Sequence, residues 1–191
     1  MKLVSYTLKK KDRLGIFVDG KIYNLNECAA GMGIEIPKTM RRFLRGGEEM
    51  MQQARNVEQA IKNGKISSFV DDPNLKLLAP VPKPTSCRDG YAFRQHVATA
   101  RRNRGVEMIP EFDQFPVFYF TNHNAIYGEG EVRVEEDHLQ KLDFELEVSV
   151  VIGKRGKNIS AKDADSYIAG YMIMNDLSAR VLQMEEMKLN L

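Results

Sequence analysis

The sequence predicts an α+β protein of two domains, a small N-terminal domain over residues 1–80 and a second domain over residues 81–191. Two observations support this prediction. Segments with strand composition outnumber helical segments, and the two kinds do not alternate regularly as they would in a doubly wound sheet. The segment at residues 80–84 holds three prolines in five residues, and it can continue neither a helix nor a central strand. This segment is therefore the expected connector between the domains.

The first domain is expected to begin with a small β unit. Residues 3–8 and 13–18 are rich in strand formers, and Asp19-Gly20 before residues 21–25 is a strong signal for a two-residue hairpin turn. Helices and one short strand are expected to follow. The helices run over residues 39–44, where Thr39 is the expected N-cap, and over residues 48–64, where Gly64 ends the helix; the strand covers residues 75–79.

The second domain is expected to contain more strand than helix. A helix is predicted over residues 91–104, and strands are predicted over residues 116–120 and 142–153. A capped helix is expected to begin at Ser160, and a short buried strand is expected over residues 172–176.

Composition excludes several classes of function. The chain has 28 basic and 26 acidic side chains and a formal charge of +2, which argues against a nucleic-acid binder. No apolar run approaches the roughly 20 residues that span a bilayer, and the N-terminal residues lack the apolar core of a signal peptide. A cytoplasmic protein with no membrane partner is expected. Cys28 and Cys87 are expected to be reduced thiols.

The clearest local feature is an acidic pattern within residues 142–153. Because side chains alternate along a strand, Asp143, Glu145 and Glu147 share one face, with neighbouring carboxylates about 7 Å apart. This face is either the solvated side of an amphipathic strand or a covered surface. On a covered surface, the three acids would require a cation or would take up protons.

Two further acids follow other predicted elements. Asp176 ends an apolar run and Asp89 follows the proline-rich connector, and either acid could serve as an ordinary helix cap. If they converge with the acidic strand, the all-oxygen donor set favours Mg²⁺, Mn²⁺ or Ca²⁺ over zinc.

A histidine and an arginine cluster lie on the predicted helix over residues 91–104. His96 follows Asp89 by about two helical turns, and it is either a surface or satisfied core residue or a member of a site. The cluster of Arg101, Arg102 and Arg104 is either a solvated helix end or a clamp for a substrate carboxylate.

Taken together, these segments resemble the fumarylacetoacetate hydrolase family over about residues 76–191. The resemblance is carried by LLAPVPKP, RDGYAFRQH, IPEFDQFPVFY, LDFELEVSVVIGK, YIAGYMIMNDLSAR and VLQMEE, which occur in the order of the family's motifs. It implies an incomplete mixed β-roll after a smaller N-terminal domain, and a homodimer. It also implies one divalent cation, Mg²⁺ or Mn²⁺ with Ca²⁺ as a further candidate, held by Asp89, Glu145, Glu147 and Asp176.

The resemblance further implies a hydrolase that cleaves a carbon–carbon bond in a 1,3-diketo acid of the fumarylacetoacetate or acylpyruvate type, in aromatic amino acid catabolism. The metal would polarise the chelated substrate, and His96 would take a proton from the attacking water. Arg180 corresponds to a catalytic residue close to the metal-bound acid. The implied substrate contacts are Tyr91, Tyr119, Gln183 and one of Arg101, Arg102 and Arg104, with Arg102 preferred.

The sequence departs from the family pattern in three places. Thr99 stands where the short acylpyruvases carry a Glu partner for their His, and Met187 stands where fumarylacetoacetase has a Tyr. The chain also ends at Leu191, before further motifs that family members carry, so a fragment of a longer protein is expected. The alternatives are a 2-keto acid decarboxylase or a sugar-acid dehydratase on the same fold, or an inactive fragment.

Overall fold

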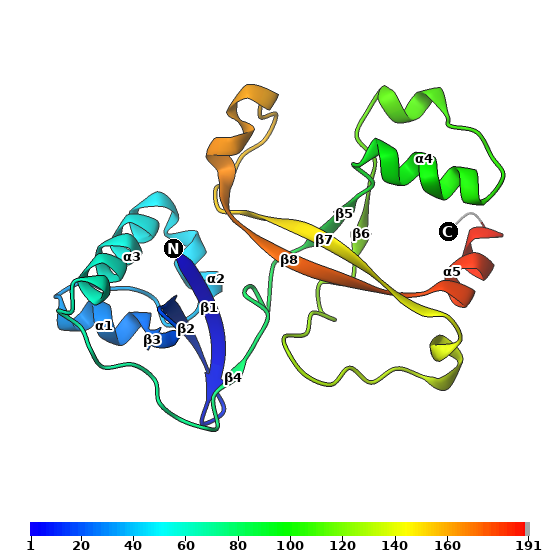
Figure 1. The fold of residues 1–191 in the computed structure, drawn as a ribbon. Coiled ribbons are helices and arrows are strands. Elements are labelled where there is room, and N and C mark those ends of the chain that lie inside the picture. Colours follow the sequence, from blue (N-terminus) through cyan, green and yellow to red (C-terminus); the bar gives the residue numbers. More distant parts are fainter. Residues whose placement is uncertain (190–191) are drawn as a thin grey trace. The chain divides into compact units, whose positions relative to one another are not determined.

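The computed structural model describes residues 1–189 and contains both helices and antiparallel strands (Figure 1), which confirms the predicted α+β class. Its internal contacts divide the chain into two compact units. One unit is Met1–Pro82 together with Tyr127–Leu191, and the other is Lys83–Ile126. The contacts thus group the C-terminal segment with the N-terminal residues, and the domain limits of 1–80 and 81–191 stay a prediction.

The N-terminal part of the first unit is built on a four-stranded antiparallel sheet in the order β3-β2-β1-β4. Asp19 and Gly20 turn between the second and third strands with φ angles of 47° and 79°, as the hairpin prediction requires. The expected strand over residues 75–79 is reduced to two paired residues. The four strands are β1 (Lys2–Leu8), β2 (Lys11–Val18), β3 (Lys21–Asn24) and β4 (Lys76–Leu77).

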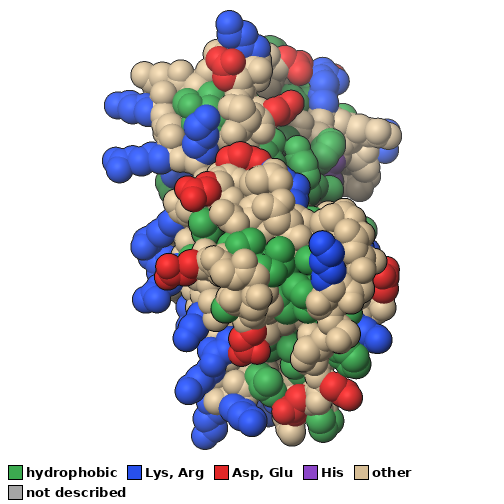
Figure 2. Space-filling model, turned by 90° about the vertical axis from the view of Figure 1, so that its left-hand side faces the viewer, with side chains coloured by type: hydrophobic (Ala, Val, Ile, Leu, Met, Phe, Trp, Pro, Cys, Tyr) green, Lys and Arg blue, Asp and Glu red, His purple; other side chains and the backbone are tan. Residues whose placement is uncertain are grey.

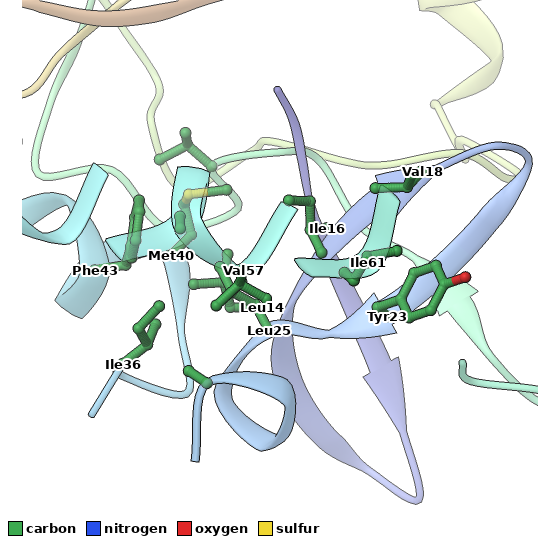
Figure 3. Close-up of a cluster of buried hydrophobic side chains, with 13 residues drawn as sticks. Leu14, Ile16, Val18, Tyr23, Leu25, Ile36, Met40, Phe43, Val57 and Ile61 are labelled. Atoms are coloured by element: carbon green, nitrogen blue, oxygen red, sulfur yellow. The ribbon is translucent and has the colours of Figure 1, made fainter. Parts of the chain in front are cut away.

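Three helices, α1 (Leu25–Gly31), α2 (Met40–Arg45) and α3 (Gly47–Lys62), form a common core with this sheet. Figure 3 shows the core, in which Leu14 of β2, Phe43 of α2 and Val57 of α3 have no exposed surface. The apolar side chains of α3 that recur at three- and four-residue spacing are buried at Ala54, Val57, Ala60 and Ile61. Thr39 occupies the N-cap position of α2, as predicted, but its side chain makes no capping hydrogen bond.

The second unit contains an antiparallel ribbon of two strands, β5 (Cys87–Gly90) and β6 (Phe118–Thr121). Between these strands lie α4 (Arg94–Asn103) and a short 3₁₀ helix, η1 (Pro110–Asp113). The strand expected over residues 116–120 starts two residues later, because Pro116 has no N–H group to donate to a ladder. The helix expected over residues 91–104 also starts later, at Arg94.

The C-terminal part of the first unit is a long antiparallel hairpin, drawn in yellow and orange in Figure 1. Its strands are β7 (Leu142–Ile152) and β8 (Ile168–Ala179), preceded by the 3₁₀ helix η2 (Glu136–Leu139) and followed by α5 (Arg180–Met187). The strand expected over residues 172–176 is present as part of β8, but pairing with β7 extends it to twelve residues. The helix expected from Ser160 is the 3₁₀ helix η3 (Ala161–Tyr167).

The two faces of this hairpin differ in exposure in an unexpected way. On β7, Glu145 and Glu147 are half-buried and Asp143 at the strand's start is exposed. Phe144, Leu146 and Val148, on the opposite face, are 61%, 72% and 65% exposed. On β8, Tyr171 and Ile173 continue the exposed apolar face. On the opposite face, Met172 of β8 and Val151 of β7 pack against the N-terminal core. The predicted burial of the whole strand over residues 172–176 was therefore wrong for alternate side chains.

The remaining surface is mixed in charge. Figure 2 shows basic and acidic side chains on one face of the molecule, with hydrophobic side chains reaching the surface between them. Within residues 1–189, no helix is both long and apolar enough to cross a bilayer. Within residues 1–189, Cys28 and Cys87 form no disulfide bond, and burial raises the pKa of the Cys28 thiol.

Tyr6 makes the folding of the first unit sensitive to alkaline pH. Burial, reinforced by the negative charge of Glu27, raises the pKa of Tyr6 from 10.0 to about 12. Between these pH values the unfolded chain has released the phenolic proton and the folded chain has kept it, so stability falls as the pH rises. We expect Tyr6→Phe to flatten this loss when urea unfolding is followed from pH 9 to pH 12. An unchanged slope would contradict the assignment.

Candidate metal centre

Three of the predicted ligands lie on the half-buried face of the β7–β8 hairpin. Glu145 of β7 pairs directly with Asp176 of β8, and Glu147 is the diagonal neighbour of Asp176 in the same register. Carboxylate oxygens of Glu147 and Asp176 lie within 4.8 Å of each other. Like charges this close favour either a bound cation or a shared proton. The hairpin therefore brings together acids that the sequence placed 29 or more residues apart.

Asp176 does not have the local role that its sequence position allowed. Its sequence position is that of a strand end or a helix cap, but β8 continues for three residues beyond it, and α5 begins only at Arg180. The cross-strand hydrogen bonds with β7 carry the strand through the polar segment from Asn175 to Ser178. Asp176 is consequently held in the middle of a paired strand, which fixes the direction of its side chain.

Arg180 connects two acids of the same face. Its Nη2 donates to Oε1 of Glu145 at 2.7 Å, and its Nε donates to Oδ2 of Asp143 at 3.0 Å. Its Nη1 donates to Oε1 of Gln183 at 3.0 Å, one turn further along α5. The hydrogen bond to Glu145 is the main cause that raises the pKa of the Arg180 guanidinium. The pKa of Asp143 is lowered, first by the N–H of Phe144 and then by Arg180.

In the second unit, Asp89 lies on the β5–β6 ribbon. It pairs with Tyr119 in the strand register, and the Tyr119 hydroxyl donates to Oδ2 of Asp89 at 2.9 Å. On the ribbon, Arg88 lies over the rings of Phe118 and Phe120. The idea that Asp89 caps the following helix was wrong, because Phe93 occupies the N-cap position of α4. Strand pairing, rather than helix capping, sets the direction of this carboxylate.

The predicted general base, His96, lies in the first turns of α4 with its ring against Tyr91. The two ring centroids are 5.7 Å apart in an edge-on arrangement, and Phe112 of η1 contacts the Tyr91 ring in the same way at 6.2 Å. Arg94, two residues before His96, forms an ion pair with Asp113 of η1 at 3.0 Å. These contacts tie the start of α4 to η1 and orient the imidazole.

The three candidate arginines on α4 differ in what they contact. Arg101 donates from Nε to the carbonyl of Glu107, and Arg104 donates to the carbonyl of Ala100 at 3.2 Å. No hydrogen bond or ion pair of the Arg102 side chain is recorded within residues 1–189. The role of Arg102 as the arginine that binds substrate stays a prediction.

The structure groups the predicted site residues within each unit. The hairpin and α5 bring together Glu145, Glu147, Asp176, Arg180 and Gln183. The second unit brings Asp89 to Tyr119, and Tyr91 to His96. Sequence reasoning missed the bond between Asp143 and Arg180. The alternation that puts Asp143 and Glu145 on one face was the only signal available for it.

Comparison with solved structures defines the class of fold. The chain is similar to a fumarylacetoacetate hydrolase from Exiguobacterium antarcticum, with a TM-score of 0.59 and 20% identity over 98% of this chain and 59% of that chain. It is also similar to a maleylpyruvate hydrolase from Sphingobium sp. SYK-6, with a TM-score of 0.60 and 18% identity over 93% of this chain and 59% of that one. The predicted fumarylacetoacetase type of fold is therefore confirmed.

Sequence comparison gives the family. The model of the fumarylacetoacetate (FAA) hydrolase C-terminal family matches residues 85–191, and the chain belongs to this family. It is 31% identical to a fumarylacetoacetate hydrolase domain-containing protein 2 homolog of Dictyostelium discoideum, over 97% of this chain and 57% of that protein. It is also 31% identical to the oxaloacetate tautomerase YisK of Bacillus subtilis (strain 168), over 96% of this chain and 62% of that protein.

A human relative, oxaloacetate tautomerase FAHD2A, mitochondrial, is 31% identical over 86% of this chain and 48% of its own length. The chain thus spans about half to three fifths of the length of the curated relatives it matches.

The hydrogen bond between Tyr119 and Asp89 should stabilise the second unit measurably. Because the acceptor is a carboxylate, we expect Tyr119→Phe to lower the free energy of unfolding by about 1–3 kcal/mol. Urea denaturation at pH 7 measures this change. Tyr127→Phe, at a side chain that is 68% exposed, is the matched control and should have little effect. Equal stability of the two variants would contradict a formed bond.

Proposed function

We propose that the protein containing this chain is a divalent-metal-dependent hydrolase that cleaves a carbon–carbon bond in a 1,3-diketo acid. The observation that carries the proposal is the pair formed by Glu147 and Asp176, with Glu145 directly opposite Asp176, on the half-buried face of the hairpin. Membership of the fumarylacetoacetate hydrolase family supports the same reaction class.

The donor set fits a hard cation. Glu145, Glu147 and Asp176 offer only carboxylate oxygens, which suit Mg²⁺ or Mn²⁺, with Ca²⁺ as a further candidate. Glu145 accepts from Arg180 through Oε1, so Oε2 is the atom proposed to bind the ion. Asp89 is proposed as the fourth ligand through Oδ1, because its Oδ2 accepts from Tyr119.

The chemistry divides between the ion and the side chains of this chain. When bound, the ion polarises the carbonyl of the chelated substrate and stabilises the enolate that leaves. His96 is proposed to take the proton from the attacking water, as a general base with the imidazole held against Tyr91. Arg102 is proposed to bind the substrate carboxylate, since a guanidinium can donate two parallel hydrogen bonds to a carboxylate in a bidentate pair.

The remaining substrate contacts are proposals as well. Gln183 lies beside Arg180 on α5, and both side chains adjoin the acidic face. Arg180 is proposed to act in catalysis next to the metal-bound Glu145. Tyr91 and Tyr119 are proposed to line the substrate site from the second unit. Tyr119 would then have two roles, because its hydroxyl also holds Asp89.

A second candidate function is proton transfer or decarboxylation at a 2-keto acid, with a sugar-acid dehydratase as a further alternative. The observation in its favour is that relatives in Bacillus subtilis and Homo sapiens are named oxaloacetate tautomerases. In these reactions a bound ion would likewise stabilise negative charge on a substrate oxygen, so the same acids would hold it. An inactive fragment is the remaining alternative, because the chain spans only part of its relatives.

A homodimer is proposed for the complete protein. The exposed apolar face of the hairpin, formed by Phe144, Leu146, Val148, Tyr171 and Ile173, is the kind of surface that a monomer rarely leaves in water. A small keto acid is the proposed substrate, and no nucleic-acid or membrane partner is proposed. The cytoplasmic location stays a prediction, and the human relative is named mitochondrial.

Removal of one proposed ligand should abolish metal binding and activity together. In the full-length protein, we expect Glu145→Ala to eliminate Mn²⁺ binding in a calorimetric titration and to eliminate turnover of acylpyruvates. Glu48→Ala is the control, because Glu48 forms its ion pair with Arg55 on α3. Metal-dependent turnover that survives in Glu145→Ala would rule out this ligand set.

A panel of substrates separates the two candidate functions. Acetylpyruvate, fumarylpyruvate, oxaloacetate and a 3-deoxy-2-keto sugar acid are incubated with the Mn²⁺-loaded full-length protein, and each is followed by its absorbance and by chromatography. Cleavage of the two acylpyruvates with little change in the other compounds is expected. Preferential loss or tautomerisation of oxaloacetate would transfer the assignment to the second candidate.

A further inference from the structure

The guanidinium of Arg180 is held by three side chains at once. Nε donates to Oδ2 of Asp143 at 3.0 Å, Nη2 donates to Oε1 of Glu145 at 2.7 Å, and Nη1 donates to Oε1 of Gln183 at 3.0 Å. Nη2 also lies 3.0 Å from Oδ2 of Asp143, within ion-pair distance. All three nitrogens of the guanidinium are therefore engaged. The backbone N–H of Arg180 also donates to the carbonyl of Lys141, at the start of β7, at 3.2 Å. We call Asp143, Arg180 and Glu145 the clasp.

From this geometry we infer that Asp143 is a positioning residue, which acts through Arg180 to orient the carboxylate of Glu145 for the metal. The inference rests on the proposed function, in which Glu145 is a ligand. Asp143 itself binds no metal in this proposal. Its task is to hold Arg180 in the one position from which Nη2 reaches Oε1 of Glu145, so that Oε2 stays available.

The order of the contacts supports this role. Oδ1 of Asp143 accepts from the N–H of Phe144 at 2.8 Å, and Oδ2 accepts from Arg180, so each oxygen of Asp143 is fixed by a separate donor. The backbone N–H of Phe144 thus orients the carboxylate of Asp143, this carboxylate orients the guanidinium of Arg180, and the guanidinium orients the carboxylate of Glu145. An isolated surface ion pair lacks this connection to the backbone, and it usually contributes little.

Electrostatics alone predicts the opposite effect of Arg180 on the metal. A fixed positive charge beside a cation site repels the cation, so removal of the charge without any loss of positioning should strengthen metal binding. If Arg180 instead orients Glu145, its removal should weaken metal binding, because groups that orient ligands typically change metal affinity by about 10–100-fold. The sign of the change in affinity therefore separates the two explanations.

The test measures Mn²⁺ affinity by isothermal titration calorimetry in the full-length protein, with circular dichroism to confirm folding. We expect Arg180→Gln and Asp143→Asn each to weaken Mn²⁺ binding by at least about tenfold. The double variant should be no more than about twofold weaker than Arg180→Gln, since Asp143 acts through Arg180. Asp143→Glu, which keeps the carboxylate, should recover most of the affinity that Asp143→Asn loses.

A matched control removes an acid–arginine pair elsewhere. Glu48→Gln and Arg55→Gln break such a pair on α3 and should leave the Mn²⁺ affinity unchanged. If Arg180→Gln does not fold, Arg180→Lys provides the same test, because it keeps the charge and loses the planar fork. Weaker binding by Arg180→Lys is then expected, and wild-type affinity would overturn the inference.

The outcomes separate the inference from the proposed function. Binding as tight as wild type, or tighter, in Arg180→Gln would overturn the clasp while the proposed metal site stands. Additional weakening by Asp143→Asn in the Arg180→Gln background would show that Asp143 acts through its charge alone, which also overturns the inference. A wild-type protein that binds no Mn²⁺ would overturn the proposed function, and the positioning role with it.

Discussion

Antiparallel pairing between β7 and β8 is the interaction on which the candidate metal centre depends. Its register places Glu145 opposite Asp176 and ends the ladder with Leu142 opposite Ala179, so that Arg180 follows immediately and reaches back to the acids. A slip of one residue would turn every acid of β7 to the opposite face, because side chains alternate with a period of two. The chemistry of the site is thus a consequence of backbone hydrogen bonding over eleven residues of β7.

The half-buried position of the acids on the hairpin has an electrostatic consequence. Glu145, Glu147 and Asp176 are half-buried, so water screens their charges less than it would at an open surface. Arg180 compensates for this cost at Glu145. The carboxylate oxygens of Glu147 and Asp176 lie within 4.8 Å of each other. The acids can therefore have different roles. Glu145 is oriented by the Arg180 guanidinium, and Glu147 and Asp176 are close enough to bind one cation together.

Local sequence patterns predicted well those elements whose structure depends on neighbouring residues. The turn at Asp19-Gly20 formed where two residues with positive φ were needed, and the helix expected over residues 48–64 formed as α3. The shared face of Asp143, Glu145 and Glu147 was also predictable, since alternation along one strand requires no knowledge of its partner.

Predictions failed where a partner distant in sequence decided the outcome. Asp176 and Asp89 have the residue type and position of helix caps, but pairing with β7 and with β6 places both in strands. The same pairing lengthened β8 from five expected residues to twelve. The exposed side of the hairpin was missed for the related reason that an apolar pattern shows which residues share a face, not which face is covered.

The sequence by itself determined the α+β class, the family resemblance, the residue types of the donor set and the face that carries three of the acids. These properties follow from composition, motif order and the period of a single strand. Only the tertiary structure decided that Asp176 stands opposite Glu145, that Tyr119 holds Asp89 and that Arg180 joins Asp143 to Glu145. The physical reason is that each of these contacts is set by cross-strand register, a property of two segments together that neither segment encodes alone.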